Sequence, residues 1–242
     1  MKLGGEGVPA KDVTVGKPQI TVPTSIVLEK EVGIVGGAPN AAVHYSGITY
    51  VGKNCGGIDS IDMQGNLPPF VASGNGRVGS IQVHGDGLLA LRAGVPYQLC
   101  LYSLDGKLMR SHKQEGGTIT HGRWMVVVEG LALVVCRALK QINIHSTNDF
   151  TLLRSVKCDS VPSGGYFSIA AIGKDSLILA SDRGIISILN YHTGQVTWTS
   201  SHKFCETAVQ PLNDEIVILS GSNYYDKKMD VSVKLLNIKT GQ

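Results

Sequence analysis

Short apolar runs bounded by turn residues follow one another along most of the sequence. Residues 175–198 show this pattern most clearly, with apolar runs over 176–181, 185–190 and 195–200 that are separated by Asp182-Arg183-Gly184 and Thr193-Gly194. Runs of about six residues between such turns predict β-strands. The same unit recurs along the chain, so the sequence predicts an all-β fold built from repeats.

Five such units are expected. Their closing turns contain Gly65, Gly106, Asp149, Gly194 and Gly241, which gives successive spacings of 41, 43, 45 and 47 residues. A period of about 40 to 50 residues in an all-strand chain is typical of β-propeller blades, small sheets that bury their apolar faces against neighbouring blades. We therefore predict a β-propeller of about five blades, which is either complete or part of a longer propeller.

The apolar runs within each unit give the positions of the expected strands. They lie at 41–45, 48–51 and 58–62; 80–83, 88–91 and 99–104; 118–120, 124–128 and 141–145; 166–171, 176–181, 185–190 and 195–200; and 207–210, 215–219 and 231–238. The apolar segment 131–139 fits either a strand continuation or an extended loop of the third unit.

Two regions are expected along the chain. Residues 1–18 contain Gly, Pro and Lys and are expected to form a flexible lead-in, whereas residues 19–242 are expected to form a single propeller domain or a propeller fragment. The fifth unit ends after its third strand. The apolar segment 20–28 is one candidate for the fourth strand of that unit, and a propeller of more than five blades is the alternative.

A repeat signature appears at Asn190-x-x-Thr193-Gly194-x-x-x-Trp198, and Asn237-x-x-Thr240-Gly241 repeats its first half. This signature resembles the third and fourth strands of a blade in the WD40-like and quinoprotein-like β-propeller families. The repeats are divergent, because no Gly-His precedes the units and no Trp-Asp follows their third strands. The resemblance implies a propeller fold over about residues 40–242.

Composition narrows the class of protein further. Charged residues make up 17% of the chain and hydrophobic residues 43%, which favours a folded protein over a disordered one. The five cysteines are odd in number, and Cys100 and Cys136 lie in apolar runs, so we expect buried free thiols and a cytoplasmic location. The most apolar segment, 124–136, is shorter than the roughly 20 residues of a membrane span, so no membrane insertion is expected.

The sequence contains no recognisable catalytic or cofactor-binding set. The seven histidines show no spacing typical of metal ligands, and most aspartates stand beside turn residues. Residues 74–79 match Gly-x-Gly-x-x-Gly but precede an apolar run that predicts a strand, whereas a dinucleotide site requires a helix there. We therefore expect a protein that is not an enzyme and that uses no metal, cofactor or small-molecule substrate.

The candidate partner-binding residues are basic and aromatic. They are Arg110 and Lys113, after the second closing turn, and Tyr224, Tyr225, Lys227 and Lys228, in a loop of the fifth unit. Basic residues on outer strands also protect sheet edges, which is the simpler interpretation of Arg110 and Lys113. Tyrosines suit a contact surface because they bury a large area and keep a polar end.

The favoured function is a non-catalytic scaffold that binds other protein subunits of a larger complex. A ligand- or cofactor-binding propeller enzyme, quinoprotein-like or sugar-binding, is the first alternative, and an RNA-binding propeller is the second. A formal charge of +3 does not by itself indicate nucleic acid, so RNA is the less favoured partner.

Overall fold

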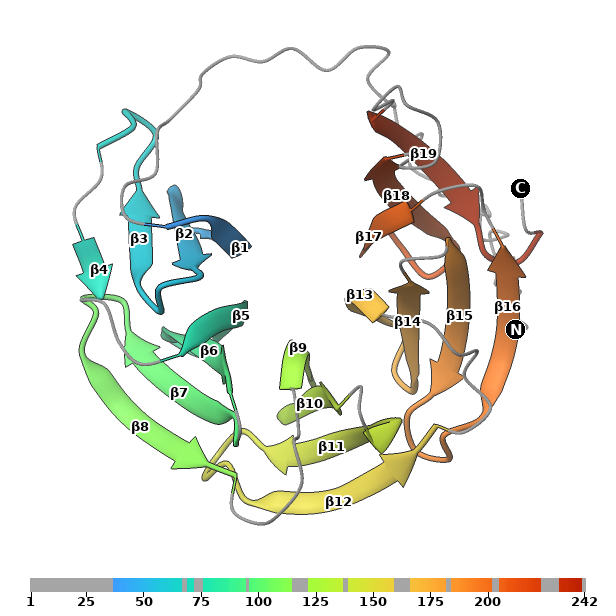
Figure 1. Cartoon of the computed structure of the whole chain (residues 1–242), viewed down its shortest axis with the longest axis horizontal. Helices are drawn as coiled ribbons and strands as arrows, with labels where there is room; N and C mark the ends of the chain where they lie inside the picture. The colour runs from blue at the N-terminus through green and yellow to red at the C-terminus, as the bar shows by residue number, and fades with distance from the viewer. Residues whose placement is uncertain are drawn as a thin grey trace, which may run out of the picture. The chain divides into compact units, whose positions relative to one another are not determined.

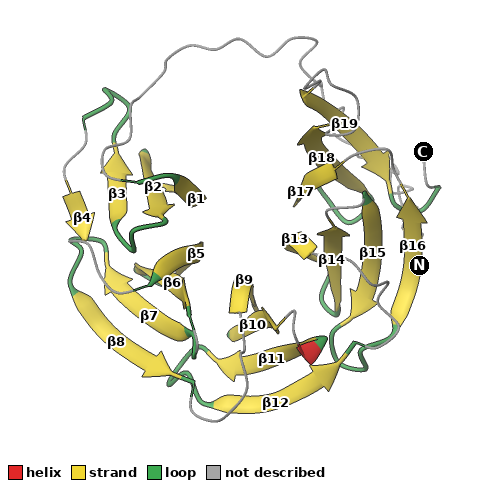
Figure 2. Ribbon diagram, in the orientation of Figure 1, coloured by secondary structure: helices red, strands yellow, loops and turns green. Residues whose placement is uncertain are grey.

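The computed structural model describes residues 37–66, 69–71, 76–94, 96–114, 122–136, 139–158, 166–181, 184–201, 205–222 and 231–240. All of them lie in one unit that spans residues 34–242. Strands and turns make up nearly all of these residues, with a short 3-10 turn at Leu139 (Figure 2). Four sheets of four strands and one sheet of three strands form a five-bladed β-propeller (Figure 1), which confirms the predicted fold class.

Each blade is an antiparallel sheet whose strands follow chain order from the innermost strand outward. Blade 1 contains β1 (Pro39–Tyr45), β2 (Ile48–Lys53), β3 (Ile58–Ile61) and β4 (Pro69–Val71). Blade 2 contains β5 (Arg77–His84), β6 (Gly87–Ala93), β7 (Gln98–Ser103) and β8 (Leu108–Lys113). Blade 3 contains β9 (Gly122–Val128), β10 (Leu131–Cys136), β11 (Gln141–Ser146) and β12 (Leu152–Lys157). Blade 4 contains β13 (Tyr166–Ile172), β14 (Ser176–Ser181), β15 (Ile185–Asn190) and β16 (Val196–Ser201), and blade 5 contains β17 (Cys205–Pro211), β18 (Ile216–Ser222) and β19 (Val231–Asn237).

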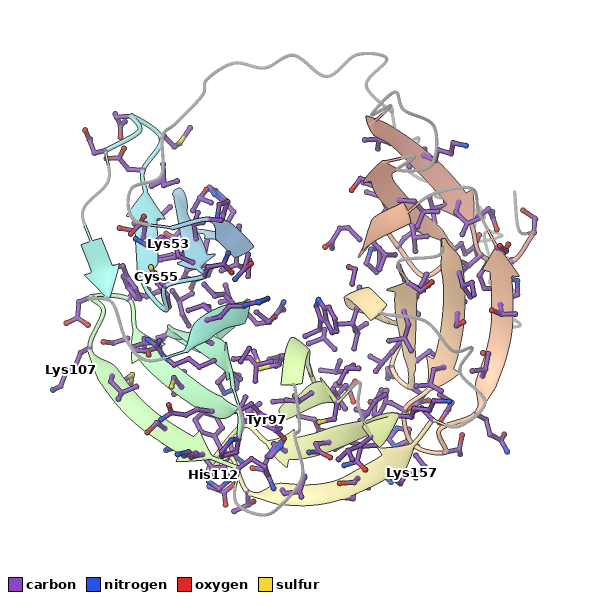
Figure 3. All side chains as sticks on the ribbon, viewed as in Figure 1. Lys53, Cys55, Tyr97, Lys107, His112 and Lys157 are labelled. Atoms are coloured by element: carbon purple, nitrogen blue, oxygen red, sulfur yellow. The ribbon has the colours of Figure 1, made fainter. Side chains whose placement is uncertain are left out.

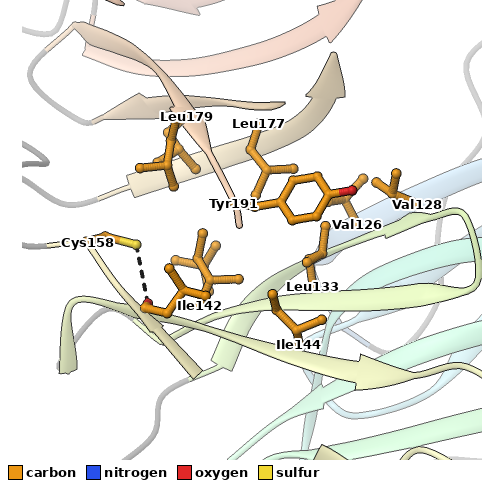
Figure 4. Close-up of a cluster of buried hydrophobic side chains, with 12 residues drawn as sticks. Val126, Val128, Leu133, Ile142, Ile144, Cys158, Leu177, Leu179 and Tyr191 are labelled. Atoms are coloured by element: carbon orange, nitrogen blue, oxygen red, sulfur yellow. Dashed lines mark hydrogen bonds between the residues drawn. The ribbon is translucent and has the colours of Figure 1, made fainter. Parts of the chain in front are cut away.

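The hydrophobic core is divided among the interfaces between consecutive blades. Four clusters of buried side chains lie between blades 1 and 2, 2 and 3, 3 and 4, and 4 and 5. In the cluster between blades 3 and 4, Leu133 and Ile144 of one blade meet Leu177 and Tyr191 of the next (Figure 4). A single sheet exposes both of its faces, so each blade is stabilised mainly by burying these faces against its neighbours.

Polar contacts join the innermost strands. The Ser80 hydroxyl in β5 donates to the Met125 carbonyl in β9, at 3.0 Å. The Val209 backbone N–H in β17 donates to the Ser168 hydroxyl in β13, also at about 3 Å. These bonds fix neighbouring blades at the inner edges of their sheets, where small side chains let the backbones approach.

The turn between β15 and β16 shows why the repeat signature contains asparagine and glycine. The Asn190 side-chain oxygen accepts hydrogen bonds from the backbone N–H groups of His192 and Thr193, at 2.9 and 3.0 Å. Gly194 then adopts a φ of +77°, and a Cβ added there would lie 2.0 Å from the Lys157 carbonyl oxygen of blade 3. The turn therefore packs on the outer strand of the preceding blade, and only glycine fits.

Most of the expected strands are confirmed, and the third unit requires a correction. Residues 124–128 lie in β9, the first strand of blade 3, and Leu131–Cys136 forms the second strand, β10. The expected run 118–120 lies outside the described residues, as do the lead-in, its boundary at residue 18 and the segment 20–28. Within the part of the chain that is described, no helix is long and apolar enough to cross a membrane.

Candidate partner-binding surface

The outermost strands of blades 2 and 3 have nearly the same sequence. β8 reads Leu-Met-Arg-Ser-His-Lys and β12 reads Leu-Leu-Arg-Ser-Val-Lys. Each strand lies at the outer edge of its sheet, and Figure 1 shows that the two strands follow one another along the outer side of the propeller. We call their exposed side chains the outer-strand surface: Leu108, Met109, Arg110, Lys113, Leu152, Leu153, Arg154 and Lys157.

Each of these strands contains a β-bulge at its second residue. In β8 the pairing with β7 skips Met109, which lies between Leu108 and Arg110. In β12 the pairing with β11 skips Leu153 in the same way. A bulge leaves the extra residue outside the hydrogen-bonded ladder. Both bulge side chains are accordingly open to solvent, 61% exposed for Met109 and 55% for Leu153.

Large apolar side chains therefore gather at the start of each strand. Leu108 is 50% exposed beside Met109, and Leu152 is 40% exposed beside Leu153. Single exposed apolar residues are common on protein surfaces. The same adjacent pair recurs at equivalent positions of two successive blades, which makes this surface a candidate interaction site.

An arginine follows each apolar pair and reaches the next blade. The Arg110 guanidinium lies over the Phe150 ring, 5.7 Å from its centroid. The Arg154 guanidinium donates to His192 Nδ1 at 2.7 Å. Because arginine can only donate, His192 Nδ1 is an acceptor and Nε2 donates to the Asp175 carboxylate, at 2.9 Å. Both arginines are thus oriented by the neighbouring blade while their side chains remain exposed.

The strands end in lysine and contain no acidic residue. Lys113 is exposed at the end of β8. Lys157 is exposed at the end of β12, and Lys107 precedes β8 (Figure 3). Asp105 and Asp149 lie in the turns before the two strands, where hydrogen bonds stabilise their carboxylates. The Ser103 hydroxyl, as the main cause, lowers the pKa of Asp105, and the Thr151 backbone N–H lowers that of Asp149. These aspartates therefore stabilise the turns, and positive charge prevails along the strands themselves.

The equivalent strand of blade 4 differs in chemistry but not in geometry. β16 reads Val-Thr-Trp-Thr-Ser-Ser, and its pairing with β15 skips Thr197. Trp198 takes the position of Arg110 and Arg154 and packs against the core between blades 4 and 5. β16 thus shares the bulge but carries no charge and no large apolar side chain at the bulge. The bulge alone already disrupts the edge ladder, so edge protection does not require the basic residues of blades 2 and 3.

A buried hydrogen-bond network lies behind this surface, between blades 2 and 3. The backbone carbonyl of Phe150 accepts from His145 Nδ1 at 3.0 Å, so His145 Nε2 is an acceptor and receives the Tyr97 hydroxyl at 2.7 Å. The Asn143 amide donates to the Tyr97 oxygen at 2.9 Å, and Ser155 donates to Asn143 at 2.8 Å. Burial lowers the pKa of His145 and raises that of Tyr97. A neutral, fully bonded histidine of this kind supports the fold and has no access to substrate.

Buried charges occur between blades 1 and 2. Arg92 Nη1 donates to the Gly56 carbonyl at 2.7 Å, and Nε and Nη2 donate to the Tyr102 hydroxyl at 3.1 and 2.9 Å. Lys53 forms a 2.7 Å ion pair with Asp59. The Arg92 bond to Gly56 holds the turn between β2 and β3 against blade 2, and the Lys53–Asp59 pair joins β2 to β3 within blade 1, so these groups have structural roles.

A small cavity lies among the innermost strands of blades 1 to 4. Its volume is about 320 Å³, and its polar lining residues are uncharged: Asn40, Ser80, Gln82, Trp124 and Ser168. Ser80 and Ser168 already form the bonds that join the blades, as described above. Across the described ranges, no group of three or more His, Cys, Asp or Glu side chains is close enough to hold a metal ion.

The structure describes only two of the six candidate residues that the sequence singled out. Arg110 and Lys113 are both exposed on β8. Tyr224, Tyr225, Lys227 and Lys228 lie outside the described residues, so their contribution stays a prediction. Sequence reasoning missed the apolar pairs of the outer-strand surface. The near-identity of residues 108–113 and 152–157, 44 residues apart, was the signal that could have revealed them.

Comparisons with known proteins agree with the geometry. No protein-family model matches the sequence. No curated protein sequence matches it either. Among solved structures, a Bacteroides caccae protein of unknown function superposes with a TM-score of 0.67 at 17% identity, over 85% of this chain and 80% of that one.

Two WD40 domains are also similar. The Pan2 WD40 domain of Neurospora crassa gives a TM-score of 0.66 at 11% identity, over 85% of this chain and 64% of that one. The WD40 β-propeller domain of Doa1 gives 0.62 at 13% identity, over 84% and 66%. The chain thus covers slightly less than two thirds of these two domains. At these identities the similarity establishes a WD40-like β-propeller fold, as the repeat signature implied.

Proposed function

We propose that this chain is a non-catalytic scaffold that binds other proteins through the outer-strand surface. The observation that carries the proposal is the repeated pairing of exposed apolar and basic side chains in β8 and β12, together with its replacement in β16. A rigid propeller displays such side chains at fixed spacing, which favours assembly of several subunits. The WD40-like fold is compatible with this role but does not by itself establish it.

Two features support a non-catalytic role. The buried polar groups that are chemically capable of catalysis, such as His145 and Tyr97, are bonded to one another between the blades. Burial also raises the pKa of Cys100, and it raises that of Cys136 to about 12, so neither thiol is an effective nucleophile near neutral pH.

Photocrosslinking tests the proposed function. Benzoylphenylalanine is placed at Met109 or at Leu153, and at Thr197 as the matched bulge position of blade 4, and each protein is irradiated in an extract of its source cells. We expect Met109 and Leu153 to capture the same protein, because they occupy equivalent places on one surface. Absence of any adduct from both positions, or an identical adduct pattern from Thr197, contradicts the proposal.

Binding of a small uncharged ligand is the second candidate function. The cavity among the innermost strands is within the lower range of ligand sites, and Asn40, Gln82 and Trp124 offer amide groups and an aromatic ring. A panel of neutral mono- and disaccharides tests it. A saccharide that raises the melting temperature of the protein, but not that of a Gln82→Leu variant, supports this second candidate, and no shift with any sugar argues against it.

We also propose a cytoplasmic location. Cys100 and Cys136 are buried and form no disulfide, and a protein with several such thiols is suited to a reducing compartment. A fluorescent fusion to the chain, imaged in its source cells, tests this location. Fluorescence confined to a secretory compartment contradicts it.

A further inference from the structure

We propose that the occupant of the outer-strand surface is an extended segment of another protein in which aliphatic pairs are separated by acidic residues, and that this segment spans β8 and β12 together. The inference rests on the proposed function and deepens it by naming the chemistry of the partner. It starts from the repeat Leu-[Met/Leu]-Arg-Ser-x-Lys in two successive edge strands.

The positive charge of the outer-strand surface favours an acidic partner. Each strand presents an arginine and a lysine, with no acidic residue between Leu108 and Lys113 or between Leu152 and Lys157. Among the described carboxylates, Asp105 and Asp149 are hydrogen-bonded in their own turns, and Asp175 is paired with His192. Carboxylates of a partner therefore have cations to pair with along both strands, and arginine binds carboxylate in a bidentate manner.

The apolar pairs select a protein over a nucleic acid. Met109 and Leu153 stand on bulges and offer flexible aliphatic contacts. Single-stranded nucleic acid is held by aromatic side chains on which bases stack, and neither β8 nor β12 contains an aromatic ring other than the partly buried His112. Each strand presents an adjacent aliphatic pair followed by an arginine and a lysine, which matches a peptide in which aliphatic pairs are separated by acidic residues.

The arrangement of the two strands sets the length of the segment. β8 ends near the turn that leads into β12, because Arg110 covers Phe150 in that turn. Two strands of this length placed end to end require roughly 40 Å, or about 12 extended residues. The bulges interrupt the edge ladder, so side chains supply most of the contact and the segment is not added to the sheet as a regular fifth strand. Engagement of both strands makes the interaction bivalent.

Fluorescence anisotropy with synthetic peptides tests the inference. The probe is a labelled peptide of about 14 residues in which pairs of Leu or Val are separated by Glu or Asp residues. The controls are a peptide of half that length, a full-length peptide with Lys in place of the acidic residues, and an oligouridylate of equal length. We expect saturable binding of the long acidic peptide, about tenfold tighter than the half-length peptide and not reproduced by the lysine peptide.

Variants locate the binding. Lys113→Glu combined with Lys157→Glu is expected to weaken binding of the long acidic peptide about tenfold, because two favourable charge contacts become repulsive. Met109→Ser combined with Leu153→Ser removes the aliphatic anchors and is expected to have a similar effect. Ser201→Glu, at the position of β16 equivalent to Lys113 and Lys157, is the matched control and is expected to leave binding unchanged.

Several outcomes overturn the inference. They are tighter binding of the oligouridylate, equal affinity of the half-length peptide, no saturable binding of the long acidic peptide, or full affinity in the Lys113→Glu/Lys157→Glu variant. Self-association of the chain through this surface, seen as concentration-dependent mass in sedimentation, also overturns it. If Met109 and Leu153 still capture a partner by photocrosslinking, the scaffold function survives and only its acidic occupant is wrong; if they capture none, both fail.

Discussion

Gly194, in a turn of blade 4, packs so closely on the backbone of blade 3 that only glycine fits. The residue has a positive φ, and its Cα faces the Lys157 carbonyl at a distance that leaves no room for a side chain. Gly173, in the first turn of the same blade, also has a positive φ but has nothing within 4 Å of an added Cβ. A comparison of substitutions at the two glycines therefore separates the energetic cost of backbone strain from the cost of disturbing the contact between blades.

Substitution by alanine is expected to distinguish these two costs. Gly173→Ala bears only the strain of the left-handed conformation and is expected to lower the free energy of unfolding by about 1 kcal/mol. Gly194→Ala has the same strain and also a clash with the Lys157 carbonyl. It is therefore expected to lower the free energy of unfolding by more than about 2 kcal/mol. Urea unfolding of both variants measures the difference. Equal losses would show that the turn moves away from β12 without cost.

His145 links stability to pH. Desolvation by burial, as the main cause, lowers its pKa in the folded state below the ordinary value of about 6.5. Above pH 6.5 the imidazole is neutral in both states. As the pH falls below 6.5, the unfolded chain takes up a proton that the folded protein does not, so stability falls by up to about 1.4 kcal/mol per pH unit until the folded-state pKa is reached.

Urea unfolding at pH 7.5 and pH 5.5 measures this contribution. The wild-type protein is expected to lose more stability between the two values than His145→Gln, which cannot titrate and can still form hydrogen bonds within the network. His145→Gln should itself cost about 1–3 kcal/mol at pH 7.5, since the Tyr97 hydroxyl loses its acceptor geometry. The same acid dependence in both proteins would exclude His145 as the titrating group.

At the scale of the strand and the turn, Arg92 joins two blades. Its guanidinium in β6 donates to the Gly56 carbonyl in the turn between β2 and β3 of blade 1 and to the Tyr102 hydroxyl in β7. Arg92→Met is expected to lower the free energy of unfolding by about 2–3 kcal/mol, because a buried carbonyl and a hydroxyl lose a charged donor. Arg77→Met, at a half-buried arginine of β5, is the matched control with an expected loss below about 1 kcal/mol. Equal losses in urea unfolding would argue against the Arg92 bonds as the cause.

The elements that the sequence predicted well are the ones with an apolar run between clear turns. Residues 176–181 and 185–190 are correct because glycine-containing turns bound them on both sides. Residues 131–136 were ambiguous because both faces of β10 are buried, so the run lacks the alternation that identifies a half-exposed strand. The outer-strand surface depends on register and on bulges, which no local pattern reveals.

At the scale of the whole molecule, three buried thiols lie in three different interfaces between blades, so the reactivity of each thiol measures the opening of one interface. Cys100 lies in the core between blades 1 and 2, Cys136 in that between blades 2 and 3, and Cys158 in that between blades 3 and 4. Repeat proteins are stabilised mainly by contacts between nearest neighbours, so these interfaces can open separately.

Alkylation in sub-denaturing urea, followed by mass spectrometry of peptides, is expected to resolve these openings. Cys55 is exposed and should react in the native protein. Cys136 and Cys158 should be more protected than Cys100, because the blades on both sides of their interfaces are themselves packed against further neighbours. Identical reaction rates for Cys100, Cys136 and Cys158 would show instead that the propeller opens as one cooperative unit.

The position shared by Arg110, Arg154 and Trp198 also limits how such a gene can gain or lose repeats. Arg154 meets His192 in the turn of blade 4, and the equivalent residue in the turn of blade 5 is Lys239. Recombination that deleted blade 4 would bring Arg154 opposite Lys239, which pairs with Glu215 at 2.6 Å, in place of the acceptor His192, so Arg154 would lose its hydrogen bond. Trp198 has no charge to pair and packs against the core between blades 4 and 5 instead. The repeats are therefore not interchangeable modules, and their order along the gene is constrained by the side chain that each presents to its successor.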